Sequence, residues 1–217
     1  MELSVSIQRI RYLLRHIICL ASAMLMMLNV SADQESSVIV RIEEDWEIDI
    51  VEPAPENDSP QVTFFVNPGV TDSNSYFQIQ MNYATDAAFS GGGFHVSAVS
   101  NDSYVDRARS GTRLGLSVDQ DTMRWTNVMA IDNNTLLFAI KNGYCRDWGN
   151  FGGPEYLVRM PATGHTTLND YRFQHSLDEV DIGFGGNRVS SVELKDVRLY
   201  YSDGRIESIP LNLFVAR

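Results

Sequence analysis

Hydrophobic and polar side chains alternate along residues 38–52, which read VIVRIEEDWEIDIVE. The even positions from 38 to 50 are apolar apart from Glu44, whereas the odd positions from 41 to 49 are Arg41, Glu43, Asp45, Glu47 and Asp49. Successive side chains of an extended strand point to opposite faces, so this period of two predicts a strand with one apolar face and one acidic face. We expect the acidic face to lie in solvent, on an edge strand that its charge protects from aggregation.

Similar runs, separated by Gly, Asn, Asp and Pro, continue through the chain. They predict strands at residues 61–66, 76–83, 94–99, 114–118, 123–131, 135–141, 156–160, 171–175, 180–184, 191–201 and 206–215. Residues 100–112 are predicted to be a polar connection, Asn142-Gly143 a hairpin turn, and residues 202–205 the turn of a C-terminal hairpin that carries Pro210 at an edge or bulge. Since no helical period is found, the pattern predicts an all-β fold, a two-sheet β-sandwich of the jelly-roll type.

The first 32 residues have the pattern of a cleaved signal peptide. Three arginines (Arg9, Arg11 and Arg15) precede an apolar run at 17–28, and small or short side chains end the segment at Ala32. Cleavage there leaves residues 33–217 as a single β-sandwich domain. The apolar run is short for a membrane span, and no later run reaches about 18 apolar residues. We therefore expect a soluble exported protein, located in the periplasm, at the cell surface or outside the cell.

Charge and cysteine content narrow the possible partners. The net charge is −11 and becomes more negative without the arginine-bearing leader. Such an excess repels nucleic acid and anionic membrane surfaces, and it suits divalent cations, neutral sugars or basic partners better. Cys145 is the only cysteine after residue 32, so no internal disulfide can form, and we expect this thiol to be a small buried hydrophobe.

Residues 47–52, EIDIVE, resemble the E-x-D-x-x-E strand signature of laminarinase and lichenase-type retaining glycoside hydrolases. The resemblance implies a nucleophile at Glu47, an orienting partner at Asp49 and an acid/base at Glu52. Period two places the first two on one face, and a bulge at 50–51 would return Glu52 to it. However, Glu43 and Asp45 extend the same acidic ladder, and the motif lies close to the start of the exported chain. A non-catalytic role is therefore favoured over hydrolysis.

Two further resemblances concern the fold. Residues 182–186, IGFGG, followed by 192–200, VELKDVRLY, are similar to the closing strands of laminin-G-like and other concanavalin-type domains. This implies a concanavalin-like jelly roll and does not specify an activity. The chain as a whole, especially VRIEEDWE at 40–47, also resembles exported β-rich proteins of planctomycete-type bacteria.

A glycine-rich segment at 143–156 provides the candidate ligand-binding residues. It carries Trp148, Phe151 and Tyr156, whose rings could stack on a sugar, with Asp147 and Asn150 near enough to bond its hydroxyls. The alternative is that the rings fill the end of the sandwich, because aromatic side chains bury large areas.

Acidic turn residues are the candidates for metal binding. Asp119, Asp121 and Asp132 could contribute oxygen ligands to calcium. Neither the turn with Asp119 and Asp121 nor the turn at Asp132 matches a known calcium-binding loop. We therefore expect these aspartates to stabilise ordinary turns, and we expect no cofactor.

Together these patterns predict an exported, non-catalytic binding or structural β-sandwich module, with carbohydrate as the favoured ligand. One alternative is a retaining β-glucan hydrolase that uses Glu47, Asp49 and Glu52. The other is a domain that binds an envelope protein or has a structural role in the envelope.

Overall fold

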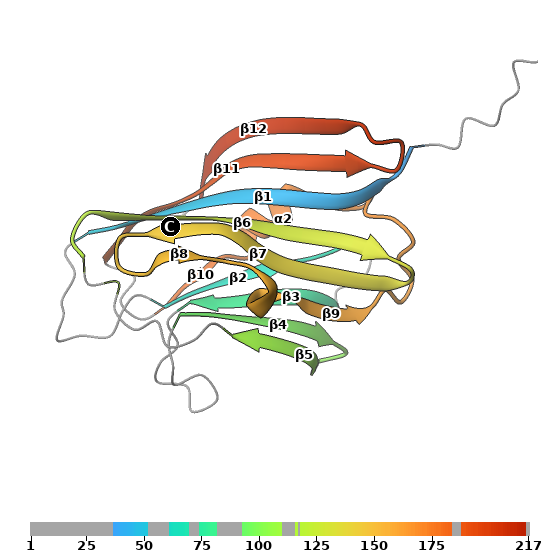
Figure 1. The fold of residues 1–217 in the computed structure, drawn as a ribbon, viewed down its shortest axis with the longest axis horizontal. Helices are drawn as coiled ribbons and strands as arrows, with labels where there is room; N and C mark the ends of the chain where they lie inside the picture. The colour runs from blue at the N-terminus through green and yellow to red at the C-terminus, as the bar shows by residue number, and fades with distance from the viewer. Residues whose placement is uncertain are drawn as a thin grey trace, which may run out of the picture. The chain divides into compact units, whose positions relative to one another are not determined.

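The computed structural model describes residues 37–51, 61–69, 74–81, 93–109, 116, 118–183 and 188–215. In these residues two antiparallel sheets form a β-sandwich (Figure 1). The predicted all-β sandwich is therefore confirmed. The predicted leader, Glu52 and most of the strand predicted at 114–118 lie outside the described residues.

The larger sheet has seven strands in the described part of the chain. Its order is β12-β11-β1-β6-β7-β8, and β9 pairs with β7. The strands are β1 (Ile39–Ile50), β6 (Asp121–Asp132), β7 (Thr135–Cys145), β8 (Gly149–Phe151), β9 (Val158–Pro161), β11 (Val189–Tyr201) and β12 (Ile206–Phe214). The predicted C-terminal hairpin is present as β11 and β12, with Pro210 on the end strand of the sheet.

The smaller sheet has five strands in the order β10-β2-β3-β4-β5. They are β10 (Asp181–Ile182), β2 (Val62–Val66), β3 (Ser75–Met81), β4 (Phe94–Ser100) and β5 (Ser103–Arg109). Strand β5 lies within the segment that was expected to be a polar connection, so that expectation is wrong. A register shift between Ala98 and Val99, where β4 pairs with β5, accompanies the broken alternation in SYVDRAR.

The helical segments of the described residues include η2 (Pro154–Tyr156) and α2 (Phe173–Asp178). The prediction of a strand at 171–175 is wrong, since α2 begins at Phe173. Gln174 donates a hydrogen bond to Asp178 one turn later, at 2.8 Å. Five residues are too few to separate a period of two from a helical one.

No helix in the described ranges is long and apolar enough to span a lipid bilayer.

The core lies between the two sheets and is rich in aromatic rings. The Trp46 ring stacks on that of Trp125 with centroids 6.5 Å apart, and Phe64 meets both edge-on at 5.1 and 5.2 Å. Phe94 continues the cluster, 5.2 Å from Trp125. Aromatic pairs in these geometries add to the free energy of apolar burial.

Asparagine and aspartate residues with positive φ close two of the hairpins. Asn133 and Asn134 (φ 45° and 63°) turn β6 into β7, and Asn101 and Asp102 (φ 49° and 57°) turn β4 into β5. The turn predicted at Asn142-Gly143 is wrong, because β7 continues to Cys145. Asn142 adopts φ 54° next to a register shift, so the pair forms an irregularity within β7.

Candidate functional site

The acidic strand β1 lies in the interior of the larger sheet, hydrogen-bonded to β11 on one side and to β6 on the other. The expectation of an edge strand is therefore wrong. Asp45 lies opposite Asp196 of β11 and Thr126 of β6. Side chains of both neighbours thus flank the acidic row on the outer face of the sheet.

The inner face of β1 is apolar, as predicted, with one exception. Glu44 is buried and accepts four hydrogen bonds: Trp46 Nε1 (3.0 Å) and Asn127 Nδ2 (3.1 Å) donate to Oε2, and Tyr171 Oη and Ser176 Oγ (both 2.6 Å) donate to Oε1. A buried carboxylate is tolerated only when donors satisfy it in this way. Glu44 therefore connects α2 and the segment before it to the larger sheet.

Burial and the charge of Glu44 affect the neighbouring phenol. Burial raises the pKa of Tyr171 well above its usual value, and the adjacent Glu44 carboxylate raises it further. Tyr171 consequently keeps its proton and remains a hydrogen-bond donor to Glu44.

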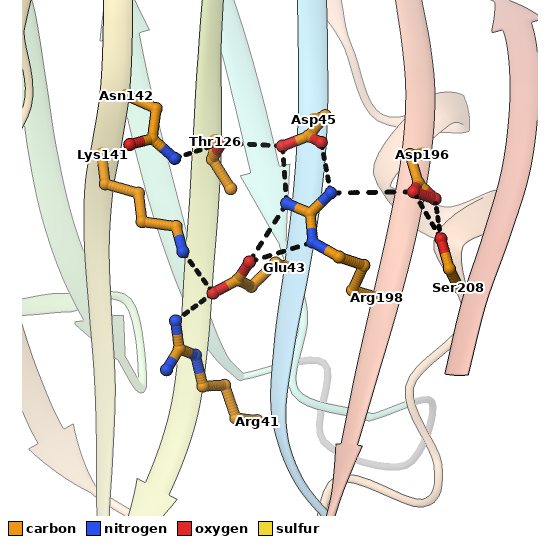
Figure 2. A network of polar contacts seen from close by, with 9 residues as sticks. All are labelled: Arg41, Glu43, Asp45, Thr126, Lys141, Asn142, Asp196, Arg198 and Ser208. Atoms are coloured by element: carbon orange, nitrogen blue, oxygen red, sulfur yellow. Dashed lines mark hydrogen bonds and ion pairs between the residues drawn. The ribbon is translucent and has the colours of Figure 1, made fainter. Parts of the chain in front are cut away.

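On the outer face, Glu43 is enclosed by three cations (Figure 2). Its side chain is 2% exposed and pairs with Arg41, with Lys141 Nζ at 2.5 Å and with Arg198 Nη2 at 3.0 Å. Burial alone raises the pKa of Glu43, but the hydrogen bond from Lys141 and the positive charges of Arg41, Lys141 and Arg198 outweigh it and lower the pKa to about 2.

Asp45 is the second acid of this network. Arg198 donates to both of its oxygens, Thr126 Oγ1 donates to Oδ1 at 2.7 Å, and Arg198 also lies 3.6 Å from Asp196. Ser208 of β12 donates to Asp196 at 2.8 Å. Figure 2 shows this chain of contacts running from β7 to β12 by way of β6, β1 and β11, which are adjacent strands of the larger sheet.

The two described members of the hydrolase motif are also held by partners. Glu47 accepts a hydrogen bond from Arg124 Nε at 2.6 Å, and Lys195 lies 3.9 Å from it. Asp49 accepts hydrogen bonds from Thr122 Oγ1 (2.6 Å) and Ser191 Oγ (2.8 Å). Glu52 lies outside the described residues, so the catalytic triplet stays a prediction.

The outer face of β1 is therefore a network of ion pairs rather than an acidic surface open to water. Its carboxylates are engaged by arginine, lysine and hydroxyl donors that come from β6, β7 and β11. This arrangement neutralises neighbouring charges across the sheet, which is a structural role. The predicted strand and its acidic face are present. The prediction of a solvated face is wrong for Glu43, which is buried, whereas Asp45, Glu47 and Asp49 are partly exposed.

The aromatic rings of the glycine-rich segment lie in the core. Trp148 and Phe151 are at most 7% exposed, Tyr156 is fully buried, and both of the first two rings contact Phe94. A Cβ at Gly143 would lie 2.3 Å from the Phe151 ring, so a glycine is needed for this packing. The rings fill the sandwich, as the alternative interpretation expected, and a sugar would need an exposed ring face.

The polar residues of that segment have partners of their own. Asp147 accepts a hydrogen bond from the backbone N–H of Val118 at 3.2 Å. Asn150 lies on β8, opposite Tyr144, and is exposed. The two side chains thus flank a buried aromatic cluster and not a ring surface available for stacking.

The candidate metal ligands lie at opposite ends of β6: Asp119 and Asp121 at its start and Asp132 at its end. Asp121 is buried and accepts hydrogen bonds from the backbone N–H groups of Arg146 and Asp147 at 3.0–3.3 Å, whereas Asp132 accepts one from Asn133 at 2.8 Å. The carbonyl of Asp119 accepts a bond from Arg146. Within the described ranges, no three His, Cys, Asp or Glu side chains are grouped so that they could hold a metal ion.

Comparisons with known proteins place the chain in no family. No family model matches it, and no curated protein matches its sequence. Among solved structures it is similar to SCP-B, a member of the eqolisin family of peptidases, in a complex with the tripeptide Ala-Ile-His. That likeness has 10% sequence identity, covers 81% of each chain and has a TM-score of 0.27. A likeness at this level supports no conclusion about fold or function.

Proposed function

We propose that the chain is an exported, non-catalytic β-sandwich module that binds carbohydrate. The proposal that the module is non-catalytic rests on the ion pairs of the acidic face of β1. Glu43, Asp45 and Glu47 each form a salt bridge with an Arg or Lys side chain. A retaining hydrolase needs one carboxyl kept protonated as the acid and one free to attack. Carboxylates neutralised by fixed cations suit a structural role better.

The proposal includes export and the finer fold type. Export rests on the leader pattern of residues 1–32, and a concanavalin-like jelly roll rests on the resemblance of the closing strands. The negative charge argues against nucleic acid as a partner. Carbohydrate is favoured because neutral sugars suit an acidic exported chain.

A hydrolysis assay tests the proposal that the protein is non-catalytic. The processed, secreted protein is incubated with β-1,3-glucan and mixed-linkage β-glucan, and released reducing ends are measured. We expect no release from wild type or from Glu47→Gln. Release by wild type that Glu47→Gln abolishes would contradict the proposal and establish the hydrolase alternative.

An envelope protein is the second candidate partner, and the end strand β12 favours it. Phe214 and Ile206, at the two ends of β12, are 65% and 57% exposed and are therefore accessible to a partner. If these side chains contact a protein, Phe214→Ser with Ile206→Ser will release the module from isolated envelopes. Retention of the double variant would exclude this surface as the contact.

A further inference from the structure

The outer face of the smaller sheet is polar. Alternation along β2, β3 and β4 directs Phe64, Ile79 and Val96 into the core and leaves the intervening residues outside. The register aligns these outer residues in two rows: Thr63, Gln80 and His95 form one, and Phe65, Gln78, Ser97 and Arg107 form the other. The alternation in the sequence predicts these strands, but it does not mark these residues as a site.

On this face the polar side chains of the middle strand, β3, are more exposed than those of β2 and β4 on either side. Thr63, His95 and Ser97 are nearly inaccessible, while Gln78 and Gln80 are partly exposed. Within the part of the chain that the structure describes, the Ser97 hydroxyl is buried without a hydrogen-bond partner. A buried hydroxyl without a partner is unfavourable, and such groups are uncommon in native proteins.

Aromatic rings border the polar rows. Phe65 and Tyr76 meet edge-on with centroids 5.6 Å apart, and both are partly exposed. Tyr104 of β5 is 51% exposed, and the Arg107 guanidinium lies 3.6 Å from its ring centroid. Residues 102–107 line a shallow, open depression at this edge of the sheet.

The charge of this face differs from that of the chain. The net charge is −11, yet β2, β3 and β4 contain no Asp or Glu. Arg107 on β5 adds a positive charge next to the amide rows. A neutral, hydroxyl-rich ligand therefore meets no charged side chain on these three strands, while Asp102 and Asp106 lie beside Arg107 in the depression around Tyr104.

We propose that the outer face of the smaller sheet is the carbohydrate-binding site, with the sugar stacked on Tyr104 and its hydroxyls bonded to Gln78 and Gln80. The inference rests on the proposed carbohydrate-binding function and moves the site away from the buried rings of residues 148–156. Amide side chains donate and accept hydrogen bonds, as sugar hydroxyls require, and an exposed phenol ring offers a flat apolar surface. The cation–π contact with Arg107 holds that ring in place.

The test compares two exposed tyrosines on opposite sheets. The full secreted protein is screened on an array of neutral β-glucan, xylan and chitin oligomers and of uronate oligomers, and the Kd of the best binder is measured by calorimetry. We expect Tyr104→Ala and Gln78→Ala to weaken binding at least tenfold. Tyr144→Ala, on β7 and 49% exposed, is the matched control and should bind as wild type does. Circular dichroism and melting temperature verify that each variant is folded.

Comparing neutral with uronate oligomers, and wild type with the variants, distinguishes the possible outcomes. If only uronate oligomers bind, Arg107→Gln should abolish that binding. If sugars bind equally well to wild type, Tyr104→Ala and Gln78→Ala, the site is wrong, although the carbohydrate function stands. If no oligomer of either class binds to wild type, both the site and the carbohydrate function are overturned.

Discussion

Arg198 of β11 donates two hydrogen bonds to Asp45 of β1, from Nη1 to Oδ2 at 2.5 Å and from Nη2 to Oδ1 at 2.9 Å. The same guanidinium contacts Glu43 and Asp196, so one cation lies among three carboxylates on adjacent strands. The hydrogen bonds that Arg198 donates to Asp45 raise the pKa of its guanidinium above the usual value. Without this cation, acidic side chains would face each other across the middle of the larger sheet.

Removing that cation should therefore be costly. We expect Arg198→Met to lower the free energy of unfolding by about 3 kcal/mol, because Glu43 keeps its burial but loses a partner. The measurement is urea denaturation at pH 7. Arg124→Met is the control, since Arg124 is 67% exposed and an exposed ion pair contributes about 1 kcal/mol or less. Equal losses in the two variants would contradict the central role of Arg198.

Glu43 should make stability depend on acid pH. Its pKa in the folded protein is about 2, below the ordinary value of 4.5, so its contribution is fully present above pH 4.5 and is lost as the pH falls toward 2. The shift corresponds to about 3 kcal/mol. The difference in unfolding free energy between wild type and Glu43→Gln should shrink over this range. A difference that stays constant from pH 6 to pH 2.5 would show that Glu43 is not the titrating group.

The buried Glu44 should be sensitive to the loss of single donors. Tyr171→Phe removes one hydrogen bond to a charged acceptor and should lower the free energy of unfolding by about 2 kcal/mol. Glu44→Ala leaves four donors unsatisfied and should cost at least twice as much as Tyr171→Phe. Tyr144→Phe removes an exposed hydroxyl and is the control for Tyr171→Phe. Thermal denaturation of all three variants checks the order.

Cys145 should be unreactive in the folded protein. Burial raises the pKa of its thiol to about 11, even though the backbone N–H of Trp148 donates to Sγ at 3.3 Å. Because the thiolate is the reactive form, labelling with a disulfide reagent at pH 8 should be slow in buffer and rapid in guanidinium chloride. Rapid labelling under native conditions would show that the core around β7 and β8 opens readily.

Pro210 should limit self-association through β12. Among the described strands, β12 ends the larger sheet, and an end strand exposes backbone groups that can pair with another chain. Proline lacks the N–H that such pairing requires. Pro210→Val should therefore shift the protein toward dimers or larger species in analytical ultracentrifugation. Ser208→Val, which adds a branched side chain on the same strand without a new donor, should sediment as wild type does.

Several features of the fold can be read from neighbouring residues alone. Alternation predicted β1, β3 and the β11–β12 hairpin within a few residues of their observed bounds, because side chains on successive strand positions always point to opposite faces. Asp203 and Gly204 likewise predicted the turn of this hairpin, because a turn also depends on neighbouring residues. Strand β5 was missed because its pattern is interrupted where it pairs irregularly with β4.

The alternation along residues 38–50 established which side chains share a face, and the chain's composition established that the protein is acidic. Tertiary structure alone decided what covers each face. The partners of Glu43 include Lys141 and Arg198, which are 98 and 155 residues away in the chain, and those of Glu44 include Tyr171, 127 residues away. Pairing between strands that are distant in the sequence brings such groups together. For this reason the row of acids on β1, which the local pattern assigns to water, forms a network of ion pairs on the outer face of the larger sheet.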